Sequence, residues 1–213
     1  SMWEAEKAKV LQAALEIKKN GLVSLSGGNV SMRVGEDRYL VTPSGMLYEN
    51  MTPEDVCIID GQGRLVEGTR KPSSDASALL YMFDHMPKIH AIIHTHQPWA
   101  TAAGFDTDEL PEFLVTVIDA CHAPVKVAPF TPSSAIGMGV LATEYAGDAL
   151  AVILKHHGVL AYGANLDEAL FSAIYLEEAA KTYVLARAMG CGIPQLDPAL
   201  IAQEKAGWQT YGQ

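Results

Sequence analysis

The chain has 213 residues, of which 49% are hydrophobic and 19% charged, and its formal net charge is -10. This composition is that of a folded globular protein and excludes a disordered chain. The acidic balance argues against nucleic acid or a membrane surface as a partner, and no apolar run approaches the roughly 20 residues that span a bilayer. Without a repeat, low-complexity tract or linker, residues 1–213 are expected to form one domain.

The first half of the chain predicts two helices and two strands. Apolar residues recur with helical spacing over residues 3–19, and the Asn-Gly pair that follows is typical of a helix end. Short apolar runs predict strands at residues 39–42 and 56–60. A second helix is expected over residues 73–85, where serines precede an apolar stripe.

The second half predicts three more strands and two more helices. The strands are expected at residues 90–96, 113–118 and 150–154, and the helices at residues 134–145 and 166–189. Strands and helices mix without the strict alternation of a doubly wound sheet. The sequence therefore predicts an α/β fold of the α/β/α kind, in which helices pack on both sides of a mainly antiparallel central sheet.

The cysteines and the first residues indicate the compartment. Cys57, Cys121 and Cys191 are odd in number and far apart, which is not the pattern of a disulfide framework or of a Cys-rich zinc site. The first residues lack the basic start and apolar stretch of a signal peptide. Both features lead us to expect a cytoplasmic protein.

Histidines give the strongest chemical signal. His94 and His96 lie two residues apart in a predicted strand, so both imidazoles point to one face. His157 follows another apolar strand. A His-x-His pair alone is also common as an ordinary surface or core pair. Together, three neutral imidazoles with one open position predict a catalytic metal site, with zinc as the natural ion and manganese or cobalt as alternatives.

Three short segments rich in Gly, Ser and Asn predict an anion pocket. They lie at residues 28–31, 42–45 and 71–75, and the last opens a predicted helix. Backbone N–H groups, hydroxyls and a helix N-terminus are the groups that hold a phosphate. Each segment by itself also fits a plain turn with a helix cap, and the three become informative only together with the histidines.

These motifs, in this order, resemble the class II aldolase/adducin family, which includes fuculose-phosphate aldolase and L-ribulose-5-phosphate 4-epimerase. The resemblance covers nearly the whole chain and implies an α/β/α fold, a divalent metal, and a homotetramer with its sites at the subunit interfaces. It rests on Gly28-Asn29-Val30-Ser31, Pro43-Ser44-Gly45, Pro72-Ser73-Ser74-Asp75, His94-x-His96 and His157-Gly158.

The resemblance also implies roles for individual residues. His94, His96 and His157 match the metal ligands of the family. Asp75 stands where the family has a catalytic carboxylate, and Tyr211 would reach into the site of a neighbouring subunit. The phosphate pocket would consist of Gly28, Asn29, Ser44, Gly45, Ser73 and Ser74.

Several positions separate the two enzyme branches. Asp75 is a glutamate in the fuculose-type aldolases and an aspartate in the epimerases. A tyrosine of the aldolases falls at Val115, whereas an acid/base aspartate of the epimerases falls at Asp119. In the other direction, Thr42 and His156 are aldolase-like, and the chain lacks an insertion that the epimerases carry before the last metal ligand.

Both branches would break a C–C bond of a small phosphorylated sugar. We expect the epimerase, in which Asp119 and Tyr211 move protons on the two faces of a retained aldehyde. The alternative is an aldolase that releases dihydroxyacetone phosphate and an aldehyde; a sugar-acid phosphate decarboxylase and a non-catalytic adducin-like scaffold are further candidates. Both branches usually carry a histidine where this chain has Leu79 or Leu80, so the sugar itself stays open.

Overall fold

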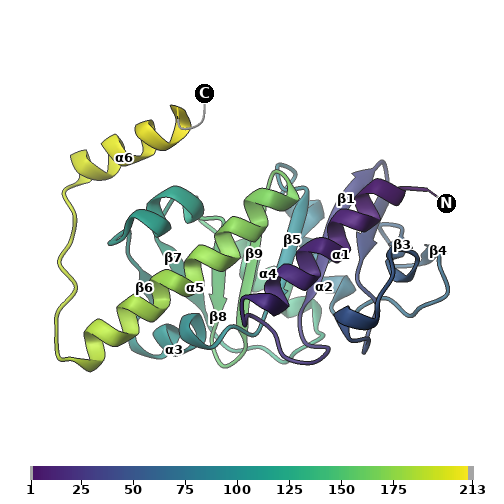
Figure 1. The fold of residues 1–213 in the computed structure, drawn as a ribbon, viewed down its shortest axis with the longest axis horizontal. Coiled ribbons are helices and arrows are strands. Elements are labelled where there is room, and N and C mark those ends of the chain that lie inside the picture. The colour runs from purple at the N-terminus through teal and green to yellow at the C-terminus, as the bar shows by residue number, and fades with distance from the viewer. Residues whose placement is uncertain (1, 211–213) are drawn as a thin grey trace.

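The computed structural model of the chain describes residues 2–210 and contains one nine-stranded sheet flanked by helices (Figure 1). The strands lie side by side in the order β4-β3-β2-β1-β5-β9-β8-β7-β6. Neighbouring strands are antiparallel except for β7 and β8, which run parallel, so the predicted mainly antiparallel sheet is confirmed. The bounds are β1 Asn29–Gly35, β2 Arg38–Val41, β3 Cys57–Ile59, β4 Leu65–Glu67, β5 Ala91–Thr95, β6 Glu109–Leu110, β7 Val125–Ala128, β8 Ala151–Leu154 and β9 Gly158–Gly163.

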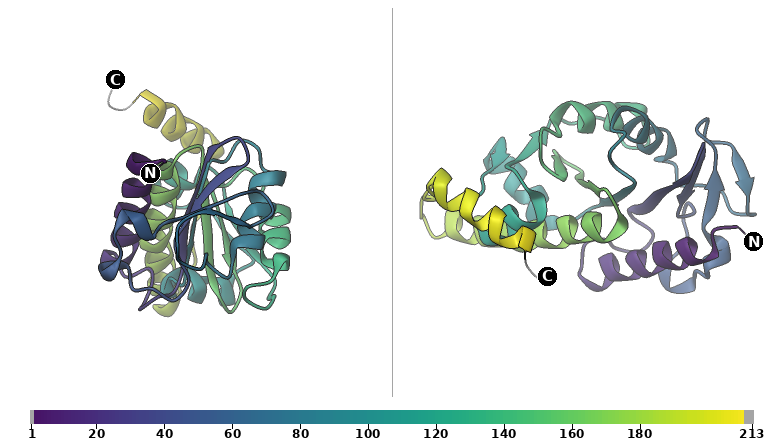
Figure 2. Two further views of the ribbon diagram at one scale, coloured as in Figure 1. Left: turned by 90° about the vertical axis from the view of Figure 1, so that its right-hand side faces the viewer. Right: turned by 90° about the horizontal axis from the view of Figure 1, so that it is seen from above.

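Helices cover both faces of this sheet (Figure 2), as the α/β/α prediction requires. Helices α1, α3 and α5 contribute to the core on one face, and α2 and α4 to the core on the other. Helix α6 stands away from the sheet and contacts the short turn η3 (Figure 1). The bounds are α1 Glu4–Lys19, α2 Ala76–His85, α3 Pro98–Asp106, α4 Ile136–Tyr145, α5 Leu166–Ala188 and α6 Pro198–Thr210, with shorter helical turns η1 Tyr48–Asn50, η2 Pro53–Asp55 and η3 Val117–Cys121.

The alternation of side chains along β5 decides where the histidines point. Ala91 and Ile93 are buried in the core beneath α1 and α5, and Ile92 in the core beneath α2 and α4. Because successive residues of a strand face opposite sides, His94 points to the same side as Ile92. The end of β5 therefore presents its histidine to the segments that lead into α2 and α4.

The four predicted helices are confirmed, and their bounds agree with the structure to within three residues at each end. Helix α5 shows why: the Asn165 side chain accepts a hydrogen bond of 2.8 Å from the Glu168 backbone N–H and caps the first turn. Helices α3 and α6 are absent from the prediction, and so are strands β1, β4, β6, β7 and β9.

The strand predicted at residues 113–118 is wrong. The chain there enters η3, a π-helical turn closed by a hydrogen bond from the His122 N–H to the Val117 carbonyl. Val117 and Ile118 are both buried although they are adjacent, a pattern that an alternating half-buried strand does not give. Packing against α5 and α6 outweighs the strand preference of these β-branched residues.

None of the helices within residues 2–210 is long and apolar enough to cross a membrane. The assignment of the whole chain to one domain stays a prediction.

Candidate metal centre and anion pocket

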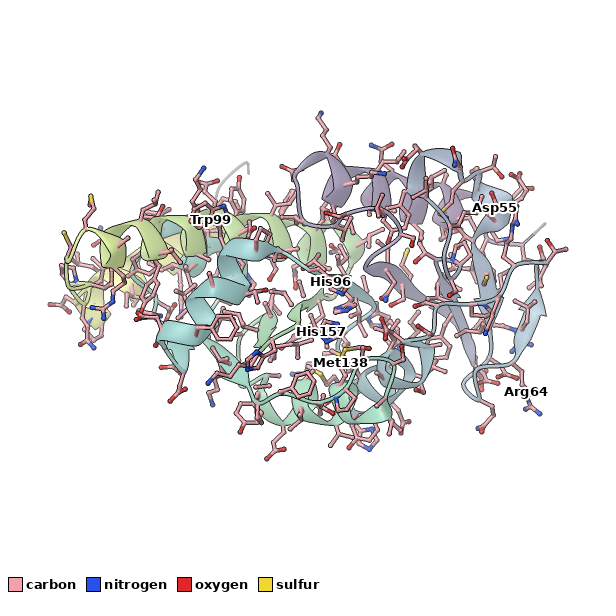
Figure 3. The ribbon with its side chains drawn as sticks, turned by 90° about the horizontal axis from the view of Figure 1, so that it is seen from below. Asp55, Arg64, His96, Trp99, Met138 and His157 are labelled. Atoms are coloured by element: carbon pink, nitrogen blue, oxygen red, sulfur yellow. The ribbon has the colours of Figure 1, made fainter. Side chains whose placement is uncertain are left out.

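Three histidines meet at the end of β5, as the sequence predicts. One ring nitrogen from each of His94, His96 and His157 lies within 4.8 Å of the other two. The Nε2 atoms of His94 and His157 are 3.2 Å apart. Figure 3 shows His96 and His157 close together in the middle of the molecule.

Two backbone features bring His157 to His94 and His96. The turn between β8 and β9 holds His156 in a left-handed conformation, with φ 63°, and His157 follows it directly. Gly158 then starts β9, which pairs antiparallel with β5. A Cβ atom on Gly158 would lie 2.0 Å from the Thr95 carbonyl oxygen, so only glycine lets the two strands approach this closely.

The His94 imidazole is held in the form that binds a metal. Its Nδ1 lies 2.9 Å from the Val159 carbonyl oxygen, which can only accept, so Nδ1 carries the proton and donates it. The lone pair is left on Nε2, the atom that faces His157. Burial lowers the pKa of His94 to about 4 and also lowers the pKa values of His96 and His157. All three imidazoles are therefore neutral at pH 7, as metal ligands must be.

The spacing of the nearest nitrogens fits a tetrahedral ion. Metal–nitrogen distances of about 2.0–2.1 Å and a tetrahedral angle place two ligand nitrogens roughly 3.3–3.4 Å apart. The separation of 3.2 Å between the Nε2 atoms of His94 and His157 is close to this value. Three imidazoles leave a fourth position for another ligand, the arrangement of a catalytic zinc site.

A carboxylate and an amide lie beside the histidines. Asp75 Oδ2 is 3.8 Å from His94 Nε2, and Asn29 Nδ2 donates to the same carboxylate oxygen at 2.9 Å and to Ser73 Oγ at 3.3 Å. Asn29 is 1% exposed, and its amide oxygen has no partner among residues 2–210. Because both amide protons are committed, the Asn29 side chain holds Asp75 toward the histidines.

His96 and His157 line a cavity of about 220 Å³ that also contains the predicted anion pocket. Five of the six residues predicted to bind phosphate line it, and the sixth, Asn29, lies behind Ser73 and Asp75. The lining residues are Ser26, Gly27, Gly28, Pro43, Ser44, Gly45, Ser73, Ser74, Asp75, His96, Ser133, Ser134 and His157.

Ser133 and Ser134 are site residues that the sequence analysis missed. They lie between β7 and α4, in a segment read only as the approach to a helix. A signal was nevertheless present, since Pro132-Ser133-Ser134 repeats the tripeptide found at residues 72–74.

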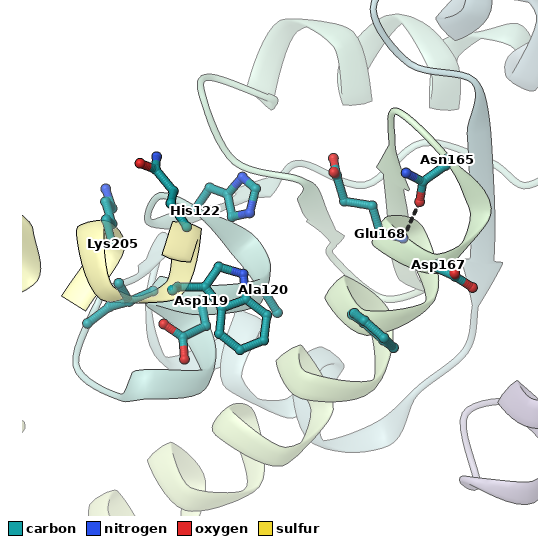
Figure 4. A pocket seen from close by; sticks show the side chains of 11 residues that line it. Asp119, Ala120, His122, Asn165, Asp167, Glu168 and Lys205 are labelled. Atoms are coloured by element: carbon teal, nitrogen blue, oxygen red, sulfur yellow. Dashed lines mark hydrogen bonds between the residues drawn. The ribbon is translucent and has the colours of Figure 1, made fainter. Parts of the chain in front are cut away.

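Asp119, predicted as an acid/base residue, does not line this cavity. It lies in η3 and lines a separate hollow of about 580 Å³ together with Lys205 of α6 (Figure 4). Burial, and to a smaller extent a hydrogen bond with Glu204, raises the pKa of Asp119 to about 6. The two hollows share no lining residue, so one chain does not bring Asp119 to its own histidines. Tyr211 lies outside the described residues.

Comparisons with known proteins identify relatives of the whole chain. A protein of Haemophilus influenzae described as L-fuculose phosphate aldolase is 32% identical over 212 residues, which cover 96% of this chain and 94% of the relative. An Escherichia coli protein of the same description is 29% identical, with the same coverage of 96% and 94%. The solved structure of an L-fuculose 1-phosphate aldolase superposes with a TM-score of 0.87 at 27% identity and covers 95% of each chain.

The sequence profile described as Class II Aldolase and Adducin N-terminal domain matches residues 8–184. That match includes the three histidines, the anion pocket and the sheet that carries them. The chain belongs to the class II aldolase and adducin family.

Proposed function

We propose that the protein is a divalent-metal aldolase that cleaves a C–C bond of a small ketose phosphate and releases dihydroxyacetone phosphate and an aldehyde. One observation carries the proposal: a single cavity joins a three-histidine cluster to a wall of glycines and serine hydroxyls. A sugar phosphate can lie in it with its phosphate at the serines and its carbonyl at the histidines. Relatives described as fuculose phosphate aldolases support the same substrate class.

The pocket suits a small anion despite the acidic surface of the protein. Ser73 and Ser74 precede Asp75, the N-cap residue of α2, and the N-terminus of this helix attracts negative charge through its unpaired N–H groups. Gly45, with φ 70°, also lines the cavity and adds no side chain to it. The cavity of about 220 Å³ is below the roughly 300–1,000 Å³ of sites for drug-sized ligands and fits a short sugar phosphate.

The reaction needs a sink for electrons and groups that move protons. When bound, a divalent metal would act as a Lewis acid and stabilise negative charge at the substrate carbonyl. Removal of the proton from the hydroxyl on the scissile-bond carbon farther from the carbonyl turns that carbon into the aldehyde, and the electron pair of the broken C–C bond passes toward the carbonyl. We assign to Asp75 the return of a proton to the remaining fragment, because Asn29 holds its carboxylate 3.8 Å from His94 Nε2.

The epimerase that we favoured from the sequence becomes the second candidate. The curated relatives are described as aldolases, which supports the alternative reading better. One observation keeps the epimerase in consideration: Asp119 has a pKa raised to about 6, near the value at which a carboxyl group can exchange protons at neutral pH. Because Asp119 lies away from its own metal cavity, it could act on substrate only in a neighbouring subunit.

This geometry supports an oligomeric active site. We propose a homotetramer in which Asp119 and Tyr211 of one subunit approach the histidines of the next. We also propose zinc as the ion, with manganese or cobalt as alternatives, since neutral imidazoles suit all three. The described cysteines are all free, which agrees with a cytoplasmic location.

A product analysis tests the proposal. The zinc-loaded protein would be incubated separately with L-fuculose 1-phosphate and L-ribulose 5-phosphate, with EDTA-treated protein as the control. Dihydroxyacetone phosphate would be measured by its coupled reduction, and epimers by NMR. We expect release of dihydroxyacetone phosphate that zinc restores after EDTA treatment. A new epimer of the pentulose phosphate without aldehyde release would instead support the epimerase.

A further inference from the structure

The dipeptide Pro-Ser occurs three times in the chain, at residues 43–44, 72–73 and 132–133. All three occurrences contribute residues to the wall of the metal cavity. The third lies about sixty residues or more after each of the other two in the sequence. The first two belong to the predicted anion pocket. The third, in the segment between β7 and α4, has no role in the function proposed above.

Ser134, the residue after the third Pro-Ser, has an unfavourable backbone conformation. Its φ is 61°, in the left-handed region that costs a non-glycine residue free energy. In this conformation its Oγ donates a hydrogen bond of 2.9 Å to Ser74 Oγ, across a sequence separation of 60 residues. The bond connects the segment before α4 with the segment before α2, directly at the cavity.

The hydrogen bonds of the two neighbouring serines explain what this contact can do. A hydroxyl group donates one hydrogen bond and accepts two. Ser73 Oγ accepts from Asn29 Nδ2 and from the Asp75 backbone N–H, at 3.3 and 3.2 Å, so its own proton remains to be donated. Ser74 Oγ accepts one hydrogen bond, from Ser134, which fills one of its two acceptor sites and leaves the Ser74 proton to be donated. Hydrogen bonds in such a chain also strengthen one another.

We propose that Ser134 is a positioning residue of the anion pocket: by donating to Ser74, it holds the Ser74 hydroxyl in place and strengthens it as a donor toward the phosphate of the substrate. The pocket then presents adjacent hydroxyl donors, which suits a ligand end that carries only acceptors, as a phosphate dianion does. A neutral sugar hydroxyl gains less from it. The inference rests on the proposed function, since it assumes that phosphate binds at these serines.

Binding of inorganic phosphate to the zinc-loaded protein tests this role. Dissociation constants would be measured by calorimetry for wild type, Ser134→Ala, Ser134→Gly, Ser74→Ala and the Ser74→Ala/Ser134→Ala double variant. Ser77→Ala serves as the matched control, because Ser77 is exposed on α2 and is not among the residues that line the cavity. Zinc content would be recorded for each variant.

We expect Ser134→Ala and Ser134→Gly to weaken phosphate binding by the same factor, about 2–10-fold, with unchanged zinc content. Glycine relieves the backbone conformation and alanine does not, so equal effects would assign the loss to the hydroxyl. In the Ser74→Ala background the loss of the Ser134 hydroxyl should have no further effect, because it acts through Ser74.

Other results would overturn the inference in distinguishable ways. Wild-type affinity for phosphate in both Ser134 variants would refute the positioning role and leave the proposed function intact. Additive losses in the double variant would mean that Ser134 contacts the phosphate directly. Failure of the wild-type protein to bind phosphate, or binding unaffected by Ser74→Ala, would remove the anion pocket itself and with it this inference.

Discussion

Replacement of Gly158 by alanine should damage both the sheet and the metal site. The new Cβ would lie 2.0 Å from the Thr95 carbonyl oxygen and 2.9 Å from His96 Cα, whereas real Cβ contacts essentially never fall below 3.0 Å. Strands β5 and β9 would have to separate by about 1 Å, and overpacking of this kind typically costs about 1–3 kcal/mol. Metal–ligand distances tolerate only about 0.2 Å, so a shift of this size should also lower metal affinity at least about 10-fold.

Urea unfolding of the metal-free protein and zinc titration of the folded protein would measure the two effects of Gly158→Ala separately. Gly192→Ala is the control, because a Cβ atom at Gly192 has no neighbour within 4 Å and the residue has an ordinary φ. If Gly158→Ala matched this control in both stability and zinc affinity, the close approach of β9 to β5 would not be what positions the histidines.

Three further changes test other parts of the site. Asn29→Ala removes the donor that holds Asp75 and should weaken zinc binding about 10–100-fold in a chelator competition assay; unchanged affinity would contradict the positioning of the carboxylate. Folding raises the pKa of Asp119 from 3.8 to about 6. Between these two pH values the folded state binds more protons than the unfolded state, so the free energy of unfolding falls as the pH rises from the lower to the higher value. Asp119→Asn should lack this pH-dependent fall, so urea titrations should show the variant gaining stability relative to wild type as the pH rises from 4 to about 7. Parallel stability profiles of the two proteins over this pH range would refute the raised pKa of Asp119. Deletion of residues 211–213 should reduce turnover and leave zinc content and oligomeric state unchanged; full turnover would exclude a role for Tyr211.

The sequence was sufficient to predict the parts of the site that depend on local periodicity. His94 and His96 share a face because a strand has period two, and His157 follows an apolar strand, so both signals are local. Helices α2 and α5 are likewise visible as apolar stripes, and Asn165 also marks the start of α5 as its capping residue.

The rest depends on contacts between distant segments. The hydrogen bond between Ser74 and Ser134 joins residues 60 positions apart, and no periodic pattern reports such a contact. The strand predicted over residues 113–118 failed because burial of adjacent β-branched residues against α5 and α6 was taken for a strand signal. Asp119 consequently lies in a helical turn rather than at the end of a strand, and it lines a hollow beside α6 instead of the metal cavity.

The central claim is that His94, His96 and His157 hold one divalent metal ion in each chain. Elemental analysis of wild type, His157→Ala and His156→Ala tests it most directly, because His156 is the adjacent residue, shares the same turn and is not part of the cluster. We predict one equivalent of metal per chain in wild type and in His156→Ala, and its loss from His157→Ala after dialysis. Equal metal content in the two variants would contradict the assignment.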